Sequence, residues 1–257
     1  MLREEAFLCI CDLLIEFSSR VPSKSNVLAP LVYLPTGPLS HLLNDFVQNH
    51  VFVDDEDTNE DQDDHSKIKE LHKRRNFLAA FSKLIIYNVL PTNAGASVFK
   101  HYVIFYNHYG DIIKALLSKA RENNKVNCAK TMAKSMIIMF RSIQNGQGNP
   151  IVVNRQTVEF HSLKELAKRF ALSFGLDALK NREAVTALHR EGILLAVNPL
   201  ENPAGPSRPP PNLSFLEILT EFSNKLLKQD KKLVLDYLDK RIEGATPSRY
   251  FAFEAYF

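Results

Sequence analysis

Three adjacent basic residues, Lys73, Arg74 and Arg75, form the most concentrated group of like charges on a predicted helix of this chain. Clustered lysines and arginines neutralise phosphates and release the counterions that surround a nucleic acid, so the triplet could bind a nucleic-acid backbone. It could equally form a solvated helix face that neutralises nearby carboxylates. The triplet alone leaves both interpretations open.

An acidic segment precedes the triplet and gives the chain a strong charge asymmetry. Residues 54–64 read DDEDTNEDQDD, with eight carboxylates in eleven residues. Residues 1–64 carry three Lys/Arg against thirteen Asp/Glu, a net charge of −10, whereas residues 65–141 carry fourteen against three, a net charge of +11. Such segregation predicts a polyanionic or acidic partner for the middle of the chain.

Further basic residues extend the candidate phosphate-binding set. The middle of the chain adds Lys114, Lys119, Arg121, Lys125, Lys130 and Lys134, and a second candidate group consists of Lys164, Lys168, Arg169, Lys180, Arg182 and Arg190. No recognition-helix motif or base-reading cluster accompanies them, so we expect any contact with nucleic acid to be insensitive to base sequence.

Other kinds of site are not supported by the residue patterns. The acidic segment does not fit a calcium loop, because Glu60 stands where the turn needs glycine and Ser66 where the bidentate glutamate belongs; we interpret it as a disordered, solvated insertion. Cys9, Cys11 and Cys128 form no metal-binding pattern and are expected to be free thiols in a reducing compartment. No nucleophile elbow, P-loop or zinc motif occurs, so we predict no catalytic residue, no metal, no cofactor and no enzymatic activity.

The elements that position these residues are predicted to be helices. A long helix is expected over residues 68–90, ended by Pro91, because its apolar residues recur at spacings of seven, three and four. Those residues are Leu71, Leu78, Phe81 and Ile85. Asp111 is expected to cap a helix that runs through residue 119. Other helices are expected over residues 2–18, 41–51, 126–143, 213–227 and 233–242.

Two further helices are bounded by glycines. A regular apolar pattern predicts a helix over residues 161–174 that ends at Gly175. The next helix is expected to begin at Asp177 or Asn181 and to be closed by Gly192. A methionine-rich stripe in the helix over 126–143 is expected to fill the core rather than to bind a partner; it consists of Met132, Met136, Met139 and Phe140.

These elements predict an all-α protein, an α-solenoid built from HEAT-like antiparallel helix pairs. The expected organisation is N-terminal helices over 1–53, an acidic disordered loop over 54–66, basic helices over 67–144, a loop over 145–160, C-terminal helices over 161–242 with a proline-rich loop at 198–211, and an atypical tail over 243–257. The apolar first turn suggests a segment of a larger fold. With no signal peptide and no apolar run of about 20 residues, we expect a soluble intracellular protein without a membrane partner.

Several long blocks resemble one known family. They are KIKELHKRRNFLAAFSKLIIYNVL, VFKHYVIFYNHYGDIIK, LKELAKRFALSFGLDALKNREAVTALHREGI and NLSFLEILTEFSNKLLKQDKK. In order and spacing they are similar to the C-terminal HEAT repeats of the stromal-antigen (stromalin) subunits of cohesin, over about residues 4–242. Family proteins are several times longer, and their groove for aromatic-x-Phe peptides lies in an N-terminal half outside these blocks. Residues 243–257 do not continue the pattern; they contain the aromatic-x-Phe sequence Phe251-Ala-Phe253.

The resemblance implies a scaffold that binds the kleisin subunit of cohesin and double-stranded DNA in the nucleus, on chromosomes, with other cohesin subunits and loaders as indirect partners. It favours DNA contact by the basic residues over a merely solvated role. Asp12 and Lys83 are isolated charges in apolar helical runs, ordinarily exposed positions; the resemblance places them on the kleisin groove. The alternative is a generic HEAT or armadillo adaptor for acidic protein segments. An all-α enzyme is a third possibility that needs a polar pocket with perturbed titratable groups.

Overall fold

A computed structural model describes residues 2–53, 64–148, 153–197, 210 and 212–241. Throughout these ranges the chain forms helices and turns without a strand, which confirms the all-α prediction. The chain divides into two compact units, residues 1–123 and 124–257. The predicted basic segment over 67–144 is therefore shared between the two units. The predicted loop over 54–66 lies mostly outside the described residues, but its last residues, from Asp64, already belong to a helix.

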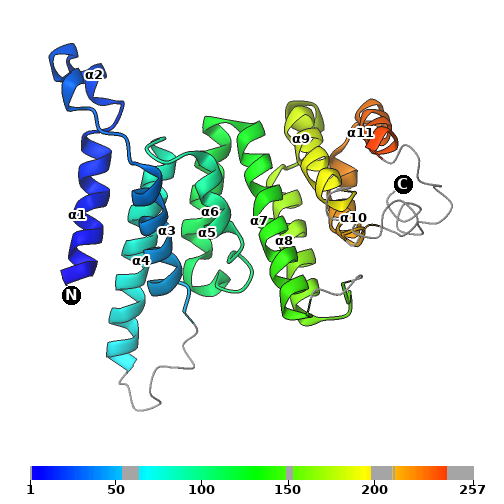
Figure 1. Ribbon diagram of the computed structural model, residues 1–257, viewed down its shortest axis with the longest axis horizontal. Helices are drawn as coiled ribbons and strands as arrows, with labels where there is room; N and C mark the ends of the chain where they lie inside the picture. The colour runs from blue at the N-terminus through cyan, green and yellow to red at the C-terminus, as the bar shows by residue number, and fades with distance from the viewer. Residues whose placement is uncertain (1, 54–63, 149–152, 198–209, 211, 242–257) are drawn as a thin grey trace. The chain divides into compact units, whose positions relative to one another are not determined.

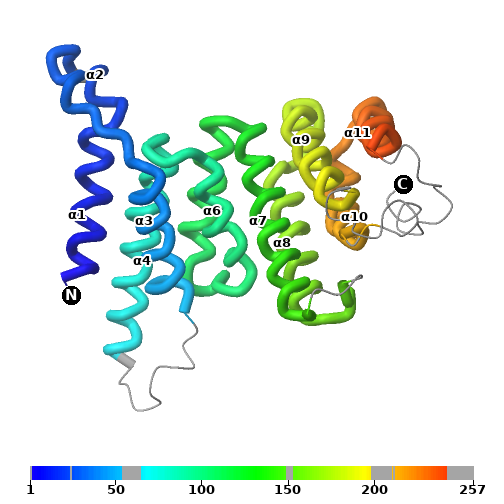
Figure 2. Tube along the Cα trace, in the orientation of Figure 1, coloured from blue at the N-terminus to red at the C-terminus, as the bar shows by residue number. Residues whose placement is uncertain are grey.

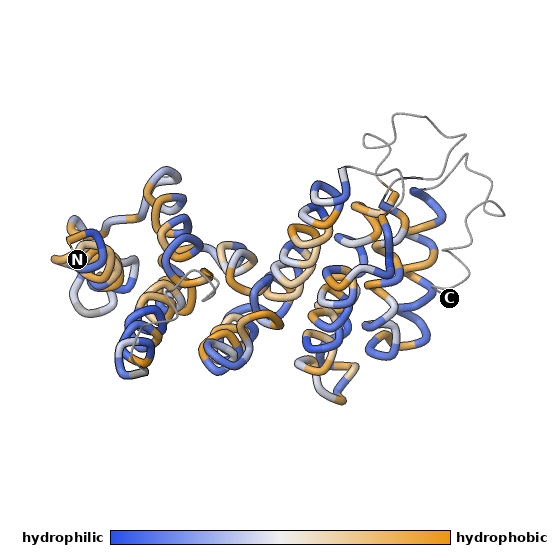
Figure 3. The backbone as a smooth tube through the Cα atoms, turned by 90° about the horizontal axis from the view of Figure 1, so that it is seen from below, coloured by the Kyte–Doolittle hydropathy of each residue, from blue (hydrophilic) through white to orange (hydrophobic). Residues whose placement is uncertain are grey.

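The first unit is built around one long helix, α4. Its helices are α1 (Leu2–Glu16), α2 (Val21–Lys24), α3 (Gly37–His50), α4 (Asp64–Ile86), α5 (Ala96–Phe99) and α6 (Tyr106–Asn123), with short 3-10 helices over Asn26–Leu31 and Thr92–Gly95. Helix α4 packs against α1, α3 and α6 (Figures 1 and 2). The helices alternate apolar and polar residues along their length, as expected of amphipathic helices that share a core (Figure 3).

Aromatic rings join three of these helices. Phe7 of α1 stacks on Phe46 of α3 with ring centroids 4.1 Å apart. Phe77 of α4 meets both rings edge-on, at 5.8 Å and 5.2 Å. Stacked and edge-to-face rings add specific geometry to the burial of apolar area. This cluster therefore fixes how α1 and α3 lie against α4.

Two helix boundaries in the first unit differ from the predictions. Helix α4 ends at Ile86, before Pro91, because Asn88 adopts a left-handed conformation with φ of 57° and Val89 N–H donates to the Leu84 carbonyl at 2.8 Å. Helix α6 begins at Tyr106 rather than at Asp111. The predicted cap at Asp111 is wrong because its carboxylate is bound by a distant arginine instead.

The second unit is arranged around α9. Its helices are α7 (Lys125–Gly146), α8 (Val158–Ser173), α9 (Ala178–Ala196), α10 (Phe215–Leu219) and α11 (Lys228–Arg241), with a 3-10 helix over Thr220–Lys225. Helix α9 packs against α7, α10 and α11, and α7 packs against α8. Within each unit, helices that are near in sequence thus pack side by side, as the solenoid prediction requires.

Local signals in the second unit are confirmed by the structure. Gly175 has a φ of 68° and its N–H donates to the Leu172 carbonyl, so it ends α8 as predicted. The side chain of Asp177 accepts from Lys180 N–H at 3.0 Å and caps α9. Met132, Met136 and Phe140 are fully buried, which confirms their predicted place in the core, whereas Met139 is only partly buried.

Gly192 does not close α9, contrary to the prediction, because the helix continues to Ala196. The glycine instead permits close packing of α9 on α10: a Cβ atom at this position would lie 2.6 Å from Leu219 Cδ2 and 2.7 Å from Cδ1. Leu219 is itself fully buried, so its side chain has little room to move aside.

We expect Gly192→Ala to destabilise the protein. The added methyl overpacks the α9–α10 contact at a cost of about 1–3 kcal/mol, which exceeds the gain of up to about 1 kcal/mol from replacing a helical glycine. Urea unfolding measures the difference. Gly146→Ala, at a helical glycine with no atom within 4 Å of the added Cβ, is the matched control. Equal stabilities of the two variants would contradict the packing role of Gly192.

Candidate functional site

Two residues of the basic triplet, Lys73 and Arg74, are bound to carboxylates of the first unit. Lys73 Nζ lies 2.8 Å from Glu4 Oε1 of α1 and 2.8 Å from Glu70 Oε2 on its own helix. Arg74 Nε lies 3.4 Å from Glu70 Oε1, and its side chain is only 11% exposed. The hydrogen bond to Lys73 lowers the pKa of Glu4, and the same bond raises the pKa of Lys73. The Lys73–Glu4 pair therefore connects α4 to α1, whereas both pairs with Glu70 lie within α4.

The third residue of the triplet, Arg75, connects α4 to the start of α6. Its guanidinium donates to both carboxylate oxygens of Asp111, at 3.0 Å and 2.5 Å, and also to the His108 carbonyl. The hydrogen bond from Arg75 lowers the pKa of Asp111. A bidentate arginine–carboxylate pair of this kind fixes direction as well as distance. All three residues of the triplet thus have intramolecular partners.

Six other predicted DNA-binding residues also form ion pairs. The pairs are Lys119–Glu122, Lys130–Glu191, Lys164–Glu217, Arg169–Glu165, Lys180–Asp177 and Arg182–Asp230, with N–O distances between 2.7 and 3.5 Å. Arg155 Nη1 also lies 3.2 Å from Glu217 Oε2 and forms a second ion pair with this carboxylate. Burial alone would raise the pKa of Glu217, but the hydrogen bonds and charges of Lys164 and Arg155 outweigh it and lower the pKa. Exposed pairs such as Lys119–Glu122 are weak and easily exchanged.

Three predicted DNA-binding residues present a charge that is not used in an ion pair. Lys114 on α6, Lys125 at the start of α7 and Lys168 on α8 are exposed, and none forms an ion pair with a residue that the structure describes. Lys134, which belongs to the same basic segment, is exposed on α7 in the same way. A phosphate can bind Lys114, Lys134 and Lys168 without competing for a carboxylate, whereas the charge of Lys125 also attracts the Asp177 carboxylate and helps to lower its pKa.

The two predicted kleisin-binding residues, Asp12 and Lys83, are both exposed in the first unit. Asp12 lies on α1 and Lys83 in the last turn of α4. Neither makes an ion pair within the described part of the chain. Their charges are therefore open to a partner, as the hypothesis requires.

An apolar pocket of about 270 Å³ lies against the apolar stripe of α1. It is lined by Ile10, Leu13, Leu14 and Phe17 of α1 together with Tyr33 and Leu39. Leu13 and Phe17 are 50% and 39% exposed although both belong to the apolar stripe of α1. The hydrogen bond from Tyr33 N–H to the Phe17 carbonyl, 2.8 Å long, holds the following segment against the end of the helix.

Sequence analysis did not identify this pocket. The stripe on α1 has the spacing of a core-facing helix, and the pattern does not indicate which neighbours cover it. Tyr33 and Leu39 lie between the helices expected over residues 2–18 and 41–51, where no element was predicted.

Titratable groups in the described ranges do not gather into a possible metal site. No group of three or more His, Cys, Asp or Glu residues there could hold a metal ion, and no described helix is long and apolar enough to cross a membrane. Burial lowers the pKa of His101 to about 3 and that of His189 to about 4. Both imidazoles are therefore neutral near pH 7; His189 is fully buried, whereas His101 is partly buried, stacks on Phe52 and is hydrogen-bonded to Gln48.

Comparison with known proteins gives consistent matches. The family profile described as the STAG protein C-terminal domain matches residues 125–256, a range that includes most of the segment expected to be an atypical tail. Cohesin subunit SA-1 of Xenopus laevis is 48% identical over 247 residues, covering 93% of this chain and 19% of the relative. Cohesin subunit SA-3 of Homo sapiens is 42% identical over 94% of this chain and 20% of the relative. Cohesin subunit scc-3 of Caenorhabditis elegans is 35% identical over 92% of this chain and 21% of the relative. The chain thus spans about a fifth of the length of these curated relatives.

We expect the Arg75–Asp111 pair to make stability depend on pH. The pKa of Asp111 is lowered in the folded state, so its ionised form stabilises the protein above the ordinary carboxyl pKa of about 3.9, and this contribution disappears as the pH falls through the lowered value. Asp111→Asn should therefore reduce the free energy of unfolding at pH 7, by up to about 1 kcal/mol for so exposed a carboxylate, and have little effect in strong acid.

Urea unfolding at neutral and acid pH measures this difference. Asp12→Asn, which removes an exposed carboxylate without an ion pair to a described residue, is the control and should leave stability unchanged at both pH values. An Asp111→Asn effect of equal size at both pH values would show that the ion pair does not contribute.

Proposed function

Because the chain belongs to the STAG family of cohesin subunits, we propose that it is a scaffold segment of such a subunit that binds the kleisin subunit and double-stranded DNA. In this role it supports sister-chromatid cohesion and chromatin looping in the nucleus, on chromosomes, and contacts other cohesin subunits and loaders indirectly. It acts by presenting surfaces to partners rather than by catalysis.

The apolar pocket on α1 carries the kleisin part of the proposal. Exposed apolar side chains that surround a concave surface are a common feature of protein-binding sites, because covering them removes apolar area from water at about 25 cal/mol per Å². Leu13 and Phe17 supply such area. Asp12 is exposed on another face of α1, about 150° around the helix at 100° per residue, where its charge can pair with a basic residue of the kleisin. Lys83 offers the opposite charge on α4.

The proposal that the chain binds DNA rests on exposed lysines. Of the twelve basic residues proposed as DNA contacts, nine form intramolecular ion pairs, and Lys114, Lys125 and Lys168 do not within the described ranges. We assign these three the largest contribution, because phosphate binding there displaces only counterions. Lys73, Arg74 and Arg75 contribute less, since a phosphate has to compete with Glu4, Glu70 and Asp111.

We expect Leu13→Asp to weaken binding of a kleisin fragment strongly. The substitution places a carboxylate on the rim of the apolar pocket, and since Leu13 is half exposed the fold should tolerate it. Co-purification with the kleisin fragment measures binding, and thermal unfolding verifies the fold. Leu42→Asp, on a 67% exposed leucine of α3 outside the pocket, is the matched control. Equal kleisin recovery with both variants would exclude the pocket.

For DNA, we expect the triple variant Lys114→Glu, Lys125→Glu, Lys168→Glu to bind random duplex DNA more weakly and with a shallower salt dependence. Loss of three phosphate contacts should reduce the slope of log K against log salt by about 2.7. Fluorescence anisotropy at several salt concentrations measures both quantities.

The matched control reverses three exposed lysines of α11 instead, Lys228, Lys231 and Lys232, which are outside the proposed DNA set. It introduces the same change in net charge. If both triple variants lose the same affinity and slope, only net charge matters and the assignment of the three lysines is wrong.

A further inference from the structure

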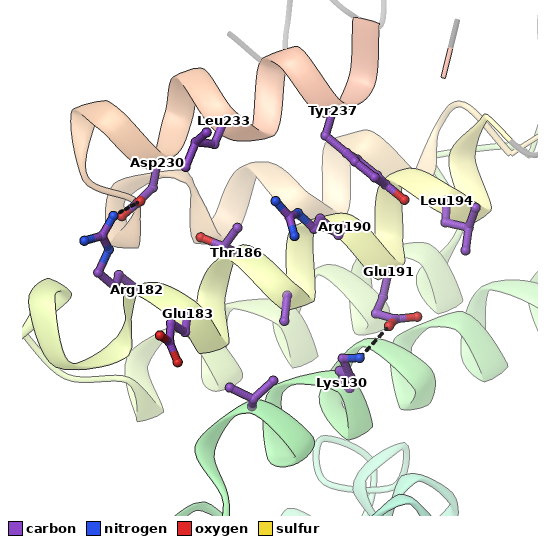
Figure 4. A pocket seen from close by; sticks show the side chains of 12 residues that line it. Lys130, Arg182, Glu183, Thr186, Arg190, Glu191, Leu194, Asp230, Leu233 and Tyr237 are labelled. Carbon is purple, nitrogen blue, oxygen red and sulfur yellow. Dashed lines mark hydrogen bonds and ion pairs between the residues drawn. The ribbon is translucent and has the colours of Figure 1, made fainter. Parts of the chain in front are cut away.

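A groove of about 820 Å³ lies between α7, α9 and α11 in the second unit (Figure 4). Two ion pairs use four of the charged groups that line it: Lys130 lies 3.5 Å from Glu191, and Arg182 lies 2.7 Å from Asp230. Two charged residues of α9 remain, Glu183 and Arg190. Both are exposed and face the groove, and neither forms an ion pair with a residue that the structure describes.

At one end of the groove, two arginines converge on a single aromatic ring. The Arg190 guanidinium lies 5.5 Å from the centroid of Tyr237, and the Arg241 guanidinium lies 5.2 Å from the same centroid. The ring attracts each cation, but the two cations repel one another. An anionic group bound between α9 and α11 would remove this repulsion, so this end is suited to a carboxylate.

The opposite end of the groove is acidic. Figure 4 places Asp230 and Glu183 near Arg182, away from Arg190 and Tyr237. Asp230 is only 2% exposed, and its Oδ2 atom accepts no hydrogen bond from a described residue, although Oδ1 is bound to Arg182. A buried acceptor without a partner is costly, so a hydrogen-bond donor that enters this end would be stabilising. This end is therefore suited to a basic side chain.

The distance between the two ends sets the geometry of a ligand. Glu183 and Arg190 are seven residues apart on one helix, or about 10 Å along its axis at 1.5 Å per residue. In an extended peptide, which rises about 3.3 Å per residue, residues three positions apart span this distance, but their side chains point to opposite faces and cannot both meet the groove. In a helical ligand the corresponding separation is seven. Leu194 and Leu233 offer partly exposed apolar contacts in the same groove.

We propose that this groove binds a segment of a partner protein in which a basic and an acidic side chain lie about 10 Å apart beside an apolar residue. The basic side chain meets Glu183 and Asp230, and the acidic one meets Arg190. Duplex DNA fits this site less well, because Glu183, Glu191 and Asp230 line the groove and repel phosphates. The site is separate in its residues from the apolar pocket on α1 and from Lys114, Lys125 and Lys168.

The test uses the full chain and synthetic peptides that contain one leucine, one lysine and one glutamate, with the two charges separated by increasing numbers of residues. Binding should be strongest at a separation of seven, at which a helical peptide presents both charges on one face, and replacing either charge with glutamine should weaken it about tenfold. Arg190→Glu should change the preference toward peptides with two lysines. Glu183→Arg should change it toward peptides with two glutamates.

Lys232→Glu, an exposed position of α11 that does not line the groove, is the control and should retain the original preference. Binding that is independent of charge spacing, or a preference that neither groove variant alters, would overturn the proposal. So would Arg190→Glu if it weakened duplex DNA binding while peptide binding stayed the same, because the arginine would then serve the DNA surface. Thermal unfolding of each variant verifies that the comparison is made on folded protein.

Discussion

The ion pairs of α4 add direction to the buried core on which the arrangement of the first unit depends. The burial of apolar area is non-directional, but close-packed side chains interdigitate and limit how neighbouring helices can shift. Lys73 binds Glu4 on α1, and Arg75 holds both carboxylate oxygens of Asp111 on α6. These directional contacts, with the ring cluster of Phe7, Phe46 and Phe77, determine the register of the three helices around α4.

This constraint changes the meaning of the charge segregation in the sequence. Among the described residues, one ion pair, Lys73–Glu4, joins the negative N-terminal part to the positive middle part, and the other paired basic residues of the middle part bind Glu70, Asp111, Glu122 and Glu191. Nine of the twelve candidate phosphate ligands are already paired, and the surface left for partners consists of a few exposed lysines and of exposed apolar side chains on α1. Partner binding therefore depends on the exposed residues whose charges are not already used in ion pairs within the chain.

The sequence predicted features that depend on nearby residues and missed those that depend on distant ones. Gly175 and Asp177 act within a turn of their own helix, so their effects on α8 and α9 were predictable. Gly192 and Asp111 looked like local helix boundaries, but Leu219 and Arg75 determine their roles through contacts formed only in the folded chain.

The candidate sites follow the same rule. The exposure of Asp12 and Lys83 could be anticipated from their isolation in apolar runs. The apolar pocket on α1 could not, because it requires knowing which segments leave Leu13 and Phe17 uncovered. The partners of Arg182 and Lys164 lie 48 and 53 residues away in sequence, beyond the reach of any local pattern.

Helix α11 has fewer buried residues than α9, the helix that it packs against. Of its residues only Asp230, Val234 and Leu238 are buried, whereas α9 is buried along most of its length. Local opening requires least free energy where few buried contacts are broken. Backbone amides of α11 should therefore exchange with solvent sooner than those of α9, so the groove has one fixed wall and one wall that detaches transiently. A ligand that bridges the two helices would slow this exchange, and occupancy of the groove thereby becomes coupled to the dynamics of a single helix.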